Sequence, residues 1–473
     1  MSVLRERQGS RSTFDARKGK RRMNGTLLTR RTVLQTAAAA LGTTSALAAP
    51  FVRGAYAAGK LSFGVWDHWV PGASEVLKKV CAEWAAKEKV DLNVDLITSN
   101  GDKDLLTLMA EGQAKAGHDI MGLRTWYVSS QADNFVPVDE IVEPVAKQYG
   151  PIAKAAEYCA KIDGHWMAVP TSFGSGALPP CARIDYFKDY VGLDIQKMYP
   201  ADASPDKALT DAWDWDHFIT SAEKCQKAGH SFGVGLSTCT DAINMAGAVF
   251  RSYGADLVDA EGTITVKTDA TRQALEFFKR LSQWLESDVY AYDNASNNKA
   301  LISGKSALIF NPPSAYAVAK RDQPKVAEQL WTFHSPKGPK GRFDPAGYYY
   351  WGIWSFSPNI AAAKSLLSYL TTREIQEKLV TAGVGFDIPP YAKWMDFKIW
   401  DEEGPPKGTN YNYPPRNDAI PSLVGYPAPL KIGTQMWAQA TIMKMIARVT
   451  QQKQSFDDAM NWAQDEIEGF MRS

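Results

Sequence analysis

The segment from residue 61 to residue 123 alternates between the two backbone periods, and this alternation limits the possible folds more than any other feature. Apolar residues recur at every second position in 61–66 and 90–96, and 118–123 is a short apolar run, as in buried β-strands. Between these runs, the apolar residues of 76–84 and 105–109 recur at helical spacing. The order β-α-β-α-β predicts an α/β fold with a mostly parallel sheet and helices on both faces.

Two of the predicted strands end in segments that combine aromatic and charged side chains. These are residues 66–69 (WDHW) and 124–127 (RTWY). In sheets of this kind, ligands bind beyond the carboxyl ends of the strands, so both segments are expected at a crevice. Neither follows a GxGxxG or GxxxxGK(S/T) sequence, which excludes the usual nucleotide and dinucleotide loops. We therefore expect a small-molecule site without a cofactor.

Further along, cap and turn residues mark additional elements. Asp214 is expected to cap a helix, followed by a strand at 232–236. Ser357 is expected to begin a later helix with proline in its first turn, and Thr371 with Glu374 forms a predicted capping box. The alternation therefore continues through most of the chain.

The amino-terminal segment, residues 1–57, has the features of an export signal that is later removed. Residues 29–35 (TRRTVLQ) form a twin-arginine motif, and a weakly apolar stretch leads to small-residue cleavage sites at 46–48 and 55–57. The stretch holds too many Thr, Ser and Gly to span a bilayer as about 20 apolar residues would. The first cysteine is Cys81, so no lipid attachment is expected at the cleavage point. The mature protein is expected to be soluble in the periplasm.

Removal of this segment changes the charge of the chain. Residues 1–57 carry 11 of the 53 basic and two of the 52 acidic residues, which leaves 42 basic and 50 acidic residues and a formal charge of −8. An acidic chain without a basic run is a poor binder of nucleic acids or anionic membranes. The remaining 416 residues exceed the roughly 250–300 at which one core stops growing, so two domains are expected.

Several motifs occur in the order typical of one transport family, and each taken alone is weak. The chain resembles the family 1 extracellular solute-binding proteins of ABC importers, the group that contains maltose-binding protein. The segments that carry this resemblance are 117–120 (GHDI), 138–139 (VD), 163–170 (DGHWMAVP), 183–187 (RIDYF), 215–218 (WDHF), 302–307 (ISGKSA) and 357–370 (SPNIAAAKSLLSYL). Gly174 and Ser175 stand where maltose-binding protein has an acidic contact, which argues against a maltose-type pocket.

The resemblance implies a two-lobed periplasmic-binding-protein fold with a ligand cleft at the hinge. It places lobe I at 58–173 and 350–400, and lobe II at 174–349 and 401–473, with each lobe a mostly parallel sheet flanked by helices. It also implies that the protein acts as a monomer and delivers a solute to the permease subunits of an ABC importer in the inner membrane.

The residue chemistry favours a carbohydrate as that solute, because flat rings pack on the CH faces of sugars while charged and amide groups bind the hydroxyls. Core packing stays the alternative for each single tryptophan, since aromatic rings serve cores more often than ligands. The expected ligand-binding set is Trp66, Asp67, His68, Trp69, Arg124, Trp126, Ser172, Phe173, Ser175, Asp241, Asn244, Asn311, Tyr350 and Trp351.

Other classes of site find less support. The six histidines show no HxxxH or HExxH spacing, so no zinc site is expected. The adjacent residues Tyr348, Tyr349 and Tyr350 resemble an iron-binding tyrosine pair, but neighbours in a strand point to opposite faces. The five cysteines show no metal spacing and are expected as buried small residues. A periplasmic carbohydrate-active enzyme and a binding protein for a non-sugar solute remain the alternatives.

Overall fold

The computed structural model describes residues 59–99, 102–200, 203–402 and 418–472. By contacts, the chain divides into a unit of residues 1–55 and a unit of residues 56–473. The predicted export signal and its cleavage sites lie outside the described residues.

The larger sheet has seven strands and confirms the predicted alternation at its centre. Its strands are β1 (Lys60–Trp66), β2 (Asp91–Ile97), β3 (Ile120–Arg124), β6 (Val169–Ala177), β10 (Lys337–Gly338), β11 (Gly341–Ile353) and β12 (Ala419–Ser422). Strand β1 runs parallel to both β2 and β3, whereas β11 runs antiparallel to β3 and β6. The carboxyl ends of β1 and β3 therefore meet at one edge, as the sequence predicts.

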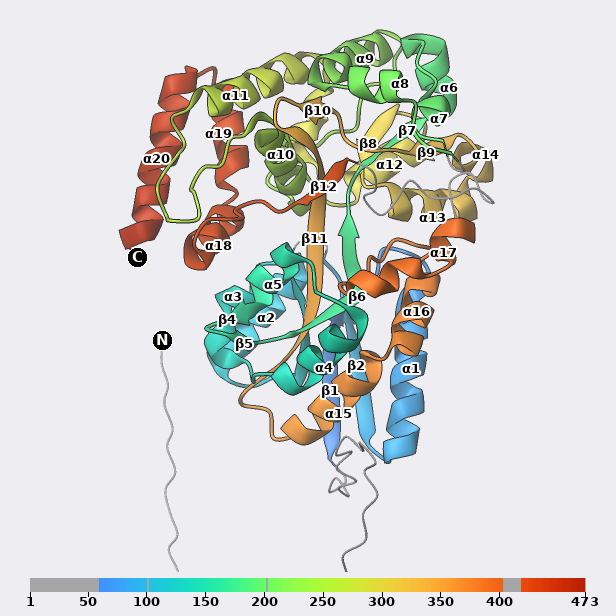
Figure 1. The fold of residues 1–473 in the computed structure, drawn as a ribbon, viewed down its shortest axis with the longest axis vertical. Helices are drawn as coiled ribbons and strands as arrows, with labels where there is room; N and C mark the ends of the chain where they lie inside the picture. The colour runs from blue at the N-terminus through green and yellow to red at the C-terminus, as the bar shows by residue number, and fades with distance from the viewer. Residues whose placement is uncertain (1–58, 100–101, 201–202, 403–417, 473) are drawn as a thin grey trace, which may run out of the picture. The chain divides into compact units, whose positions relative to one another are not determined.

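Helices from two separate parts of the chain accompany this sheet (Figure 1). They are α1 (Ala73–Glu88), α2 (Lys103–Ala114), α3 (Tyr127–Ser130), α4 (Asp139–Tyr149), α5 (Lys154–Ala160), α15 (Ile360–Leu370), α16 (Arg373–Ala382) and α17 (Ile399–Glu402). The short hairpin of β4 (Lys161–Ile162) and β5 (His165–Trp166) follows α5. Helix α1 packs on both α15 and α16, so early and late segments share one hydrophobic core.

The second sheet has three strands in the order β8-β7-β9. These are β7 (Pro180–Arg183), β8 (Leu308–Phe310) and β9 (Leu330–Thr332), and β7 is antiparallel to both of its neighbours. The prediction that each lobe has a mostly parallel sheet is therefore wrong for this sheet. Its strands are short and widely separated in the chain, so local periodicity carries no information on their direction.

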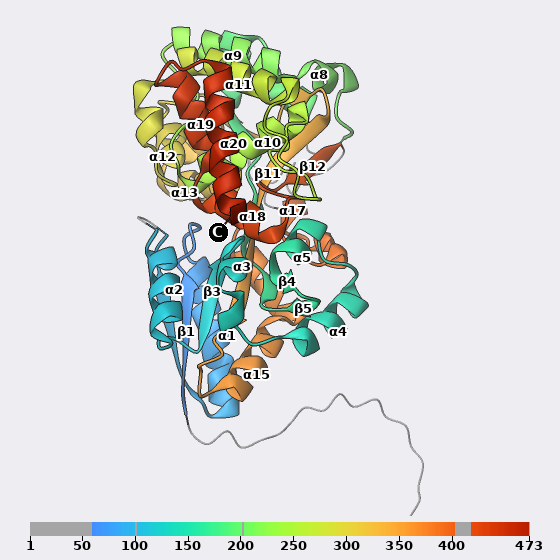
Figure 2. The same cartoon turned by 90° about the vertical axis from the view of Figure 1, so that its left-hand side faces the viewer.

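The remaining helices surround this second sheet and β10 and β12. They are α6 (Ile184–Tyr186), α7 (Ile195–Met198), α8 (Lys207–Ala212), α9 (Trp215–Lys227), α10 (Thr240–Tyr253), α11 (Asp269–Leu281), α12 (Ser296–Ile302), α13 (Pro312–Asp322), α14 (Pro324–Ala327), α18 (Leu430–Ala438), α19 (Thr441–Thr450) and α20 (Phe456–Arg472). Helices α11, α19 and α20 lie side by side (Figure 2).

Strand β11 connects two groups of elements. The first group is β1 to β6 with helices α1 to α5 and α15 to α17, and the second group is the three-stranded sheet with β10, β12, α6 to α14 and α18 to α20. The first half of β11 pairs with β10 and β12, and its second half pairs with β3 and β6. The register of β11 against β6 shifts between Gly347 and Tyr349. Gly174 of β6 has a φ of 91°, in the region that favours glycine, and it lies close to the ring of Tyr349. An irregular strand pair therefore joins the two groups.

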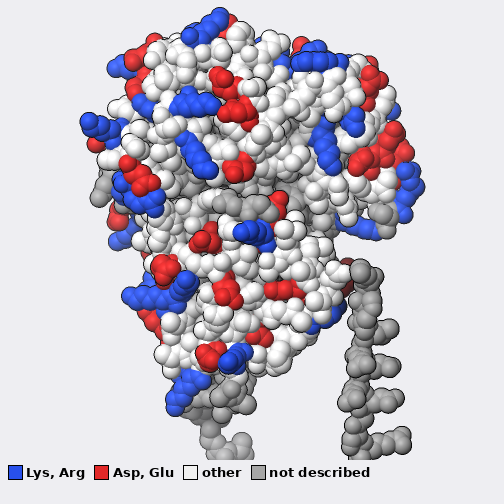
Figure 3. Space-filling model, turned by 180° about the vertical axis from the view of Figure 1, so that it is seen from behind, with Lys and Arg blue, Asp and Glu red and all other residues white. Residues whose placement is uncertain are grey.

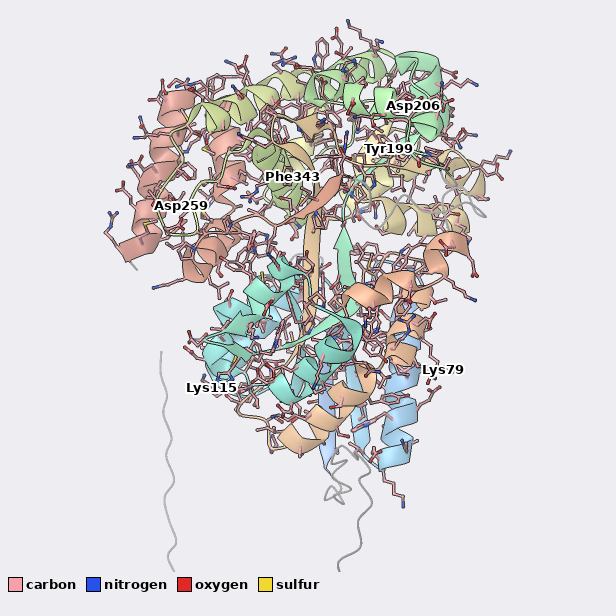
Figure 4. The ribbon with its side chains drawn as sticks, in the orientation of Figure 1. Lys79, Lys115, Tyr199, Asp206, Asp259 and Phe343 are labelled. Atoms are coloured by element: carbon pink, nitrogen blue, oxygen red, sulfur yellow. The ribbon has the colours of Figure 1, made fainter. Side chains whose placement is uncertain are left out.

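Local signals predict some helix starts correctly and miss others. The side chain of Asp214 accepts from the backbone of His217 and caps α9, as predicted, and Asp206 caps α8 in the same way (Figure 4). Helix α15 begins at Ile360, after the predicted start, and the Ser357 hydroxyl donates to Asp119 at 2.6 Å while it accepts from the amide of Asn359 at 3.0 Å. The predicted capping box at Thr371 is also absent, since its hydroxyl donates to the Leu367 carbonyl.

The predicted strand at 232–236 is wrong. The amide of Gly233 bonds the carbonyl of Leu308, but the amide of Leu236 bonds that of Val289, a different partner. A segment that changes partners within three residues forms no regular ladder with either neighbour.

The surface carries charges of both signs. Figure 3 shows one face on which lysine and arginine side chains alternate with aspartate and glutamate. In the described part of the chain, no helix is both long and apolar enough to cross a membrane. The five cysteines are free thiols, and four are buried, as expected of small core residues.

Candidate functional site

The carboxyl end of β3 carries a buried arginine that is fixed by several partners. The Nε atom of Arg124 lies 2.6 Å from Asp104, and its NH2 group donates to Asp104 at 2.8 Å and to the Tyr127 hydroxyl at 2.7 Å. Arg124 and Asp104 are 5% and 4% exposed, so this is a buried ion pair. Burial raises the pKa of Asp104, and the attraction of Arg124 offsets part of that rise.

Arg124 also reaches an element of the other group. Its NH1 group donates to the Thr240 hydroxyl at 3.2 Å, at the start of α10. We call Arg124, Asp104, Tyr127 and Thr240 the Arg124 cluster. The cluster joins the end of a central strand to the first turn of a helix that packs on β11. A buried guanidinium with these partners is held in one geometry, as recognition of polar groups requires.

Next to Thr240, the carboxylate of Asp241 lies at a small hollow of about 10 Å³. One oxygen of Asp241 accepts from the side-chain amides of Asn297 at 3.1 Å and Asn311 at 3.4 Å. Burial raises the pKa of Asp241 to about 7, against smaller lowering effects of Asn297 and Arg124. We call this feature the Asp241 hollow. Its described lining is Gly233, Val234, Gly235, Cys239, Asp241, Ala242, Met245, Tyr292, Asp293, Asn297 and Phe310.

Tyr127 also lines a broad open groove of about 900 Å³. Its walls come from α2, α3 and α18, and include Trp126, Tyr127 and Trp437. The rings of Tyr127 and Trp437 meet edge to face with centroids 5.8 Å apart. Tyr127 therefore belongs both to the Arg124 cluster and to this aromatic groove.

The structure brings three of the predicted site residues together and places Asn244 nearby. Arg124 and Asp241 lie on either side of Thr240, and Asn311 holds Asp241. Asn244 is buried within α10, one helical turn after Asp241. Arg124 ends β3, Asp241 and Asn244 lie on α10, and Asn311 precedes α13, so these residues are far apart in the sequence.

The segment after β1 divides between surface and core. Asp67 is exposed and accepts from the Ser74 hydroxyl at 2.9 Å, and Trp69 is half-buried. His68 is buried, with its Nε2 atom 3.0 Å from Asp387. Trp66 is 3% exposed and packs on the ring of Tyr349 at 5.0 Å. We therefore assign Trp66 and His68 to the core of the larger sheet.

The remaining predicted residues serve packing and backbone bonds. The Ser172 amide donates to Gln376, and Phe173 packs on Trp66. The Ser175 hydroxyl donates to the carbonyl of Thr171 at 2.6 Å. These contacts hold β6 in place, so a role in binding finds no support in the geometry.

Trp126, Tyr350 and Trp351 are each nearly inaccessible. The Tyr350 hydroxyl donates to the Ala156 carbonyl at 3.0 Å, and Trp351 packs edge to face on Phe63 at 5.8 Å. Both lie on β11, which has strands on both edges and helices α10 and α15 packed against it. Such a strand buries side chains on both faces.

Sequence reasoning missed Asp104, Thr240 and Asn297 as partners of the predicted residues. Tyr127 follows the selected Trp126, and the pairing of a strand-end arginine with a tyrosine three residues later was a usable signal. Nothing local marks Asp104 or Asn297, because their role depends on contacts between distant elements. Among the described residues, no group of three or more His, Cys, Asp or Glu could hold a metal ion.

Comparisons with known proteins give a consistent result. The sequence model of the family described as "Bacterial extracellular solute-binding protein" matches residues 77–377. A search of curated protein sequences finds no match.

Three solved structures illustrate the similarity in fold. The maltose-bound MalE3 of T. maritima is 18% identical, with a TM-score of 0.67 over 86% of this chain and 99% of that one. The GacH receptor of Streptomyces glaucescens is 19% identical, with a TM-score of 0.65 over 88% and 100%. A sugar transporter from Arthrobacter chlorophenolicus with bound laminaribiose is 13% identical, with a TM-score of 0.66 over 87% and 99%. At these identities, the likeness shows the two-lobed α/β fold.

Proposed function

Because the chain belongs to the family of bacterial extracellular solute-binding proteins, we propose that it captures a small solute and delivers it to an ABC permease. The solute class we propose is a sugar, oligosaccharide or polyol. The observation that carries the proposal is the bond from Arg124 to Thr240, which joins the larger sheet to α10 beside two hollows. A solute bound there would contact both groups of elements at once.

The composition of this region supports a carbohydrate. Tyr127 and Trp437 line the groove, although their rings are 3% and 7% exposed, and Arg124, Asp241 and Asn311 offer polar groups for the hydroxyls of a sugar. The similar solved structures were determined with maltose, acarbose or laminaribiose bound. This combination favours binding over catalysis and sugars over other solutes.

The proposed mechanism is hinge closure of two lobes around the solute. Lobe I comprises 58–173 and 350–400, and lobe II comprises 174–349 and 401–473. The register shift between Gly347 and Tyr349 and the left-handed backbone of Gly174 support a hinge at β6 and β11. A solute that contacts both lobes only in the closed form shifts the population toward that form, which a permease can recognise. We propose that the protein acts as a monomer.

We also propose that the chain is exported through the twin-arginine pathway and works in the periplasm. The twin-arginine motif at 29–35 and the small-residue sites before residue 58 support this proposal. Amino-terminal sequencing of the exported protein should give a new terminus near Ala58. A membrane-bound product that retains Arg30 and Arg31 would contradict it.

A thermal-shift screen tests the solute class. A ligand at 100 times its dissociation constant adds about 2.7 kcal/mol to the free energy of unfolding, which raises the melting temperature by a few degrees. We expect such shifts from members of a panel of mono- and oligosaccharides, polyols and sugar acids. Shifts only from metals or from amines without a sugar ring would reject the carbohydrate class. Oligosaccharides recovered as cleavage products would instead favour an enzyme.

A further inference from the structure

The Asp241 hollow has an excess of negative charge. Asp241 and Asp293 are among its lining residues, and none of the described lining residues is a lysine or arginine. Asp293 is exposed to solvent, which screens its charge, and one of its oxygens accepts from the Ser296 hydroxyl at 2.6 Å and from the Ala295 amide at 3.0 Å. The carboxylate of Asp241 is therefore the shielded charge of the hollow that lacks a counter-charge.

Asp241 also differs from an ordinary acidic residue in the first turn of a helix. Such residues usually lie in solvent near the free backbone amides. The carboxylate of Asp241 instead accepts from Asn297 of α12 and from Asn311, which precedes α13. Asn297 is 5% exposed and Asn311 is 4% exposed. Two buried neutral amides fix its position but leave its charge uncompensated.

Arg124 does not supply the missing charge. Its attraction lowers the pKa of Asp241 by less than burial raises it, and its guanidinium is bonded to Asp104 and Tyr127. The ion pair of Arg124 and Asp104 is neutral overall. The Arg124 cluster therefore presents a fixed polar wall next to a carboxylate that has no cationic partner.

We propose that the solute carries a protonated amino group, as an amino sugar does, and that this ammonium binds the carboxylate of Asp241. The inference rests on the proposed function and narrows its solute class. A neutral hydroxyl would donate a hydrogen bond to Asp241 but leave the buried charge in place. An ammonium donates and also neutralises the charge, and hydrogen bonds to ionised partners are roughly twice as strong as neutral ones.

The test compares pairs of sugars that differ at one group. Glucosamine is matched with glucose, galactosamine with galactose, and the β-1,4-linked glucosamine disaccharide with cellobiose and with its neutral N-acetylated form. Spermidine provides an amine without a sugar ring. Titration calorimetry on the mature full-length chain near neutral pH should show at least one amino sugar binding about tenfold more tightly than its neutral partner, because a bond to a charged group replaces a neutral one.

Two variants test whether Asp241 causes the preference for the amine. Asp241→Asn keeps the shape of the side chain and should reduce the ratio of the amine's affinity to that of its neutral partner to about twofold or less. Asp216→Asn removes the same charge from an exposed residue of α9, which pairs with Arg280 at 2.7 Å, and should leave the preference unchanged. A preference that survives in Asp241→Asn would overturn the inference.

The pH dependence in the native sequence provides a second measurement that needs no variant. Below about pH 7 the carboxylate of Asp241 becomes protonated, so the affinity for the amine should fall by up to tenfold per pH unit. The other groups around it do not titrate there: Arg124 stays charged, the pKa of Asp293 is lowered, that of Cys239 is raised to about 11, and burial raises those of Tyr292 and Tyr349. Because the ammonium of an amino sugar itself loses its proton above about pH 7, the affinities are compared between about pH 7 and about pH 5. A flat affinity in that range would count against Asp241 as the partner.

The results separate this inference from the proposed function. If neutral sugars bind and no amino sugar binds more tightly than its neutral partner, the proposed function stands and the inference fails. If spermidine alone binds and Asp241→Asn abolishes that binding, the cationic class stands and the carbohydrate class fails. If none of the amines binds, the inference is overturned whatever the neutral sugars do.

Discussion

Replacing Arg124 with methionine should lower the free energy of unfolding by about 3–5 kcal/mol, because it leaves the buried carboxylate of Asp104 without its partner. The loss should appear as a lower denaturant midpoint, followed by tryptophan fluorescence, and as a lower melting temperature without solute. The double variant Arg124→Met with Asp104→Leu should recover most of this stability, since two apolar side chains replace the buried pair.

The double variant also separates stability from recognition. If Arg124 holds the solute, the double variant should be stable and yet bind the solute more weakly. Its free energy of binding should be less favourable by about 1.5–3 kcal/mol, the range for a hydrogen bond to a charged group. Lys207→Met breaks the exposed pair of Lys207 with Asp211 on α8 and should change neither the melting temperature nor the affinity. An Arg124→Met chain as stable as the native one would show that the ion pair does not contribute to folding.

Local periodicity predicts the centre of the larger sheet well, because each of its first five elements is specified by its own residues. Strand β1, helix α1 and strand β2 all form within a few residues of the predicted bounds. The direction of the strands in the second sheet could not be predicted in this way. There, β7 pairs with β8 and β9 from distant parts of the chain, and only tertiary packing determines their orientation.

The candidate site follows the same division. Arg124 could be selected from the sequence because it ends a predicted strand, whereas its partners Asp104 and Thr240 could not, because long-range contacts bring them together. The prediction that Tyr350 and Trp351 face the solute meets a different obstacle. The sequence cannot show that helices α10 and α15 pack against β11, and this packing helps to bury Tyr350 and Trp351, whose side chains point to opposite faces of the sheet.

Replacing Gly174 with valine should destabilise the protein by roughly 2–5 kcal/mol, the sum of a strained backbone and an overpacked core. The φ of Gly174 is 91°, which a β-branched residue rarely adopts. A Cβ atom at this position would lie 2.8 Å from the Cγ atom of Tyr349 and 3.0 Å from the ring of Trp66. Trp66 is 3% exposed and packs on both Tyr349 and Phe173, so its ring cannot move away without cost.

Gly164→Val provides the matched control, because Gly164 has a φ of 86° but no atom within 4 Å of its added Cβ. This variant should lose only roughly 1–2 kcal/mol, the cost of the left-handed backbone. The difference between the two variants therefore measures the packing of β6 on β11. Gly174→Val should also weaken solute binding in calorimetry if these strands form the hinge, whereas Gly164→Val should bind like the native chain. Equal losses of stability in both variants would show that the conformation of Gly174, and not its contact with Tyr349 and Trp66, is what the fold requires.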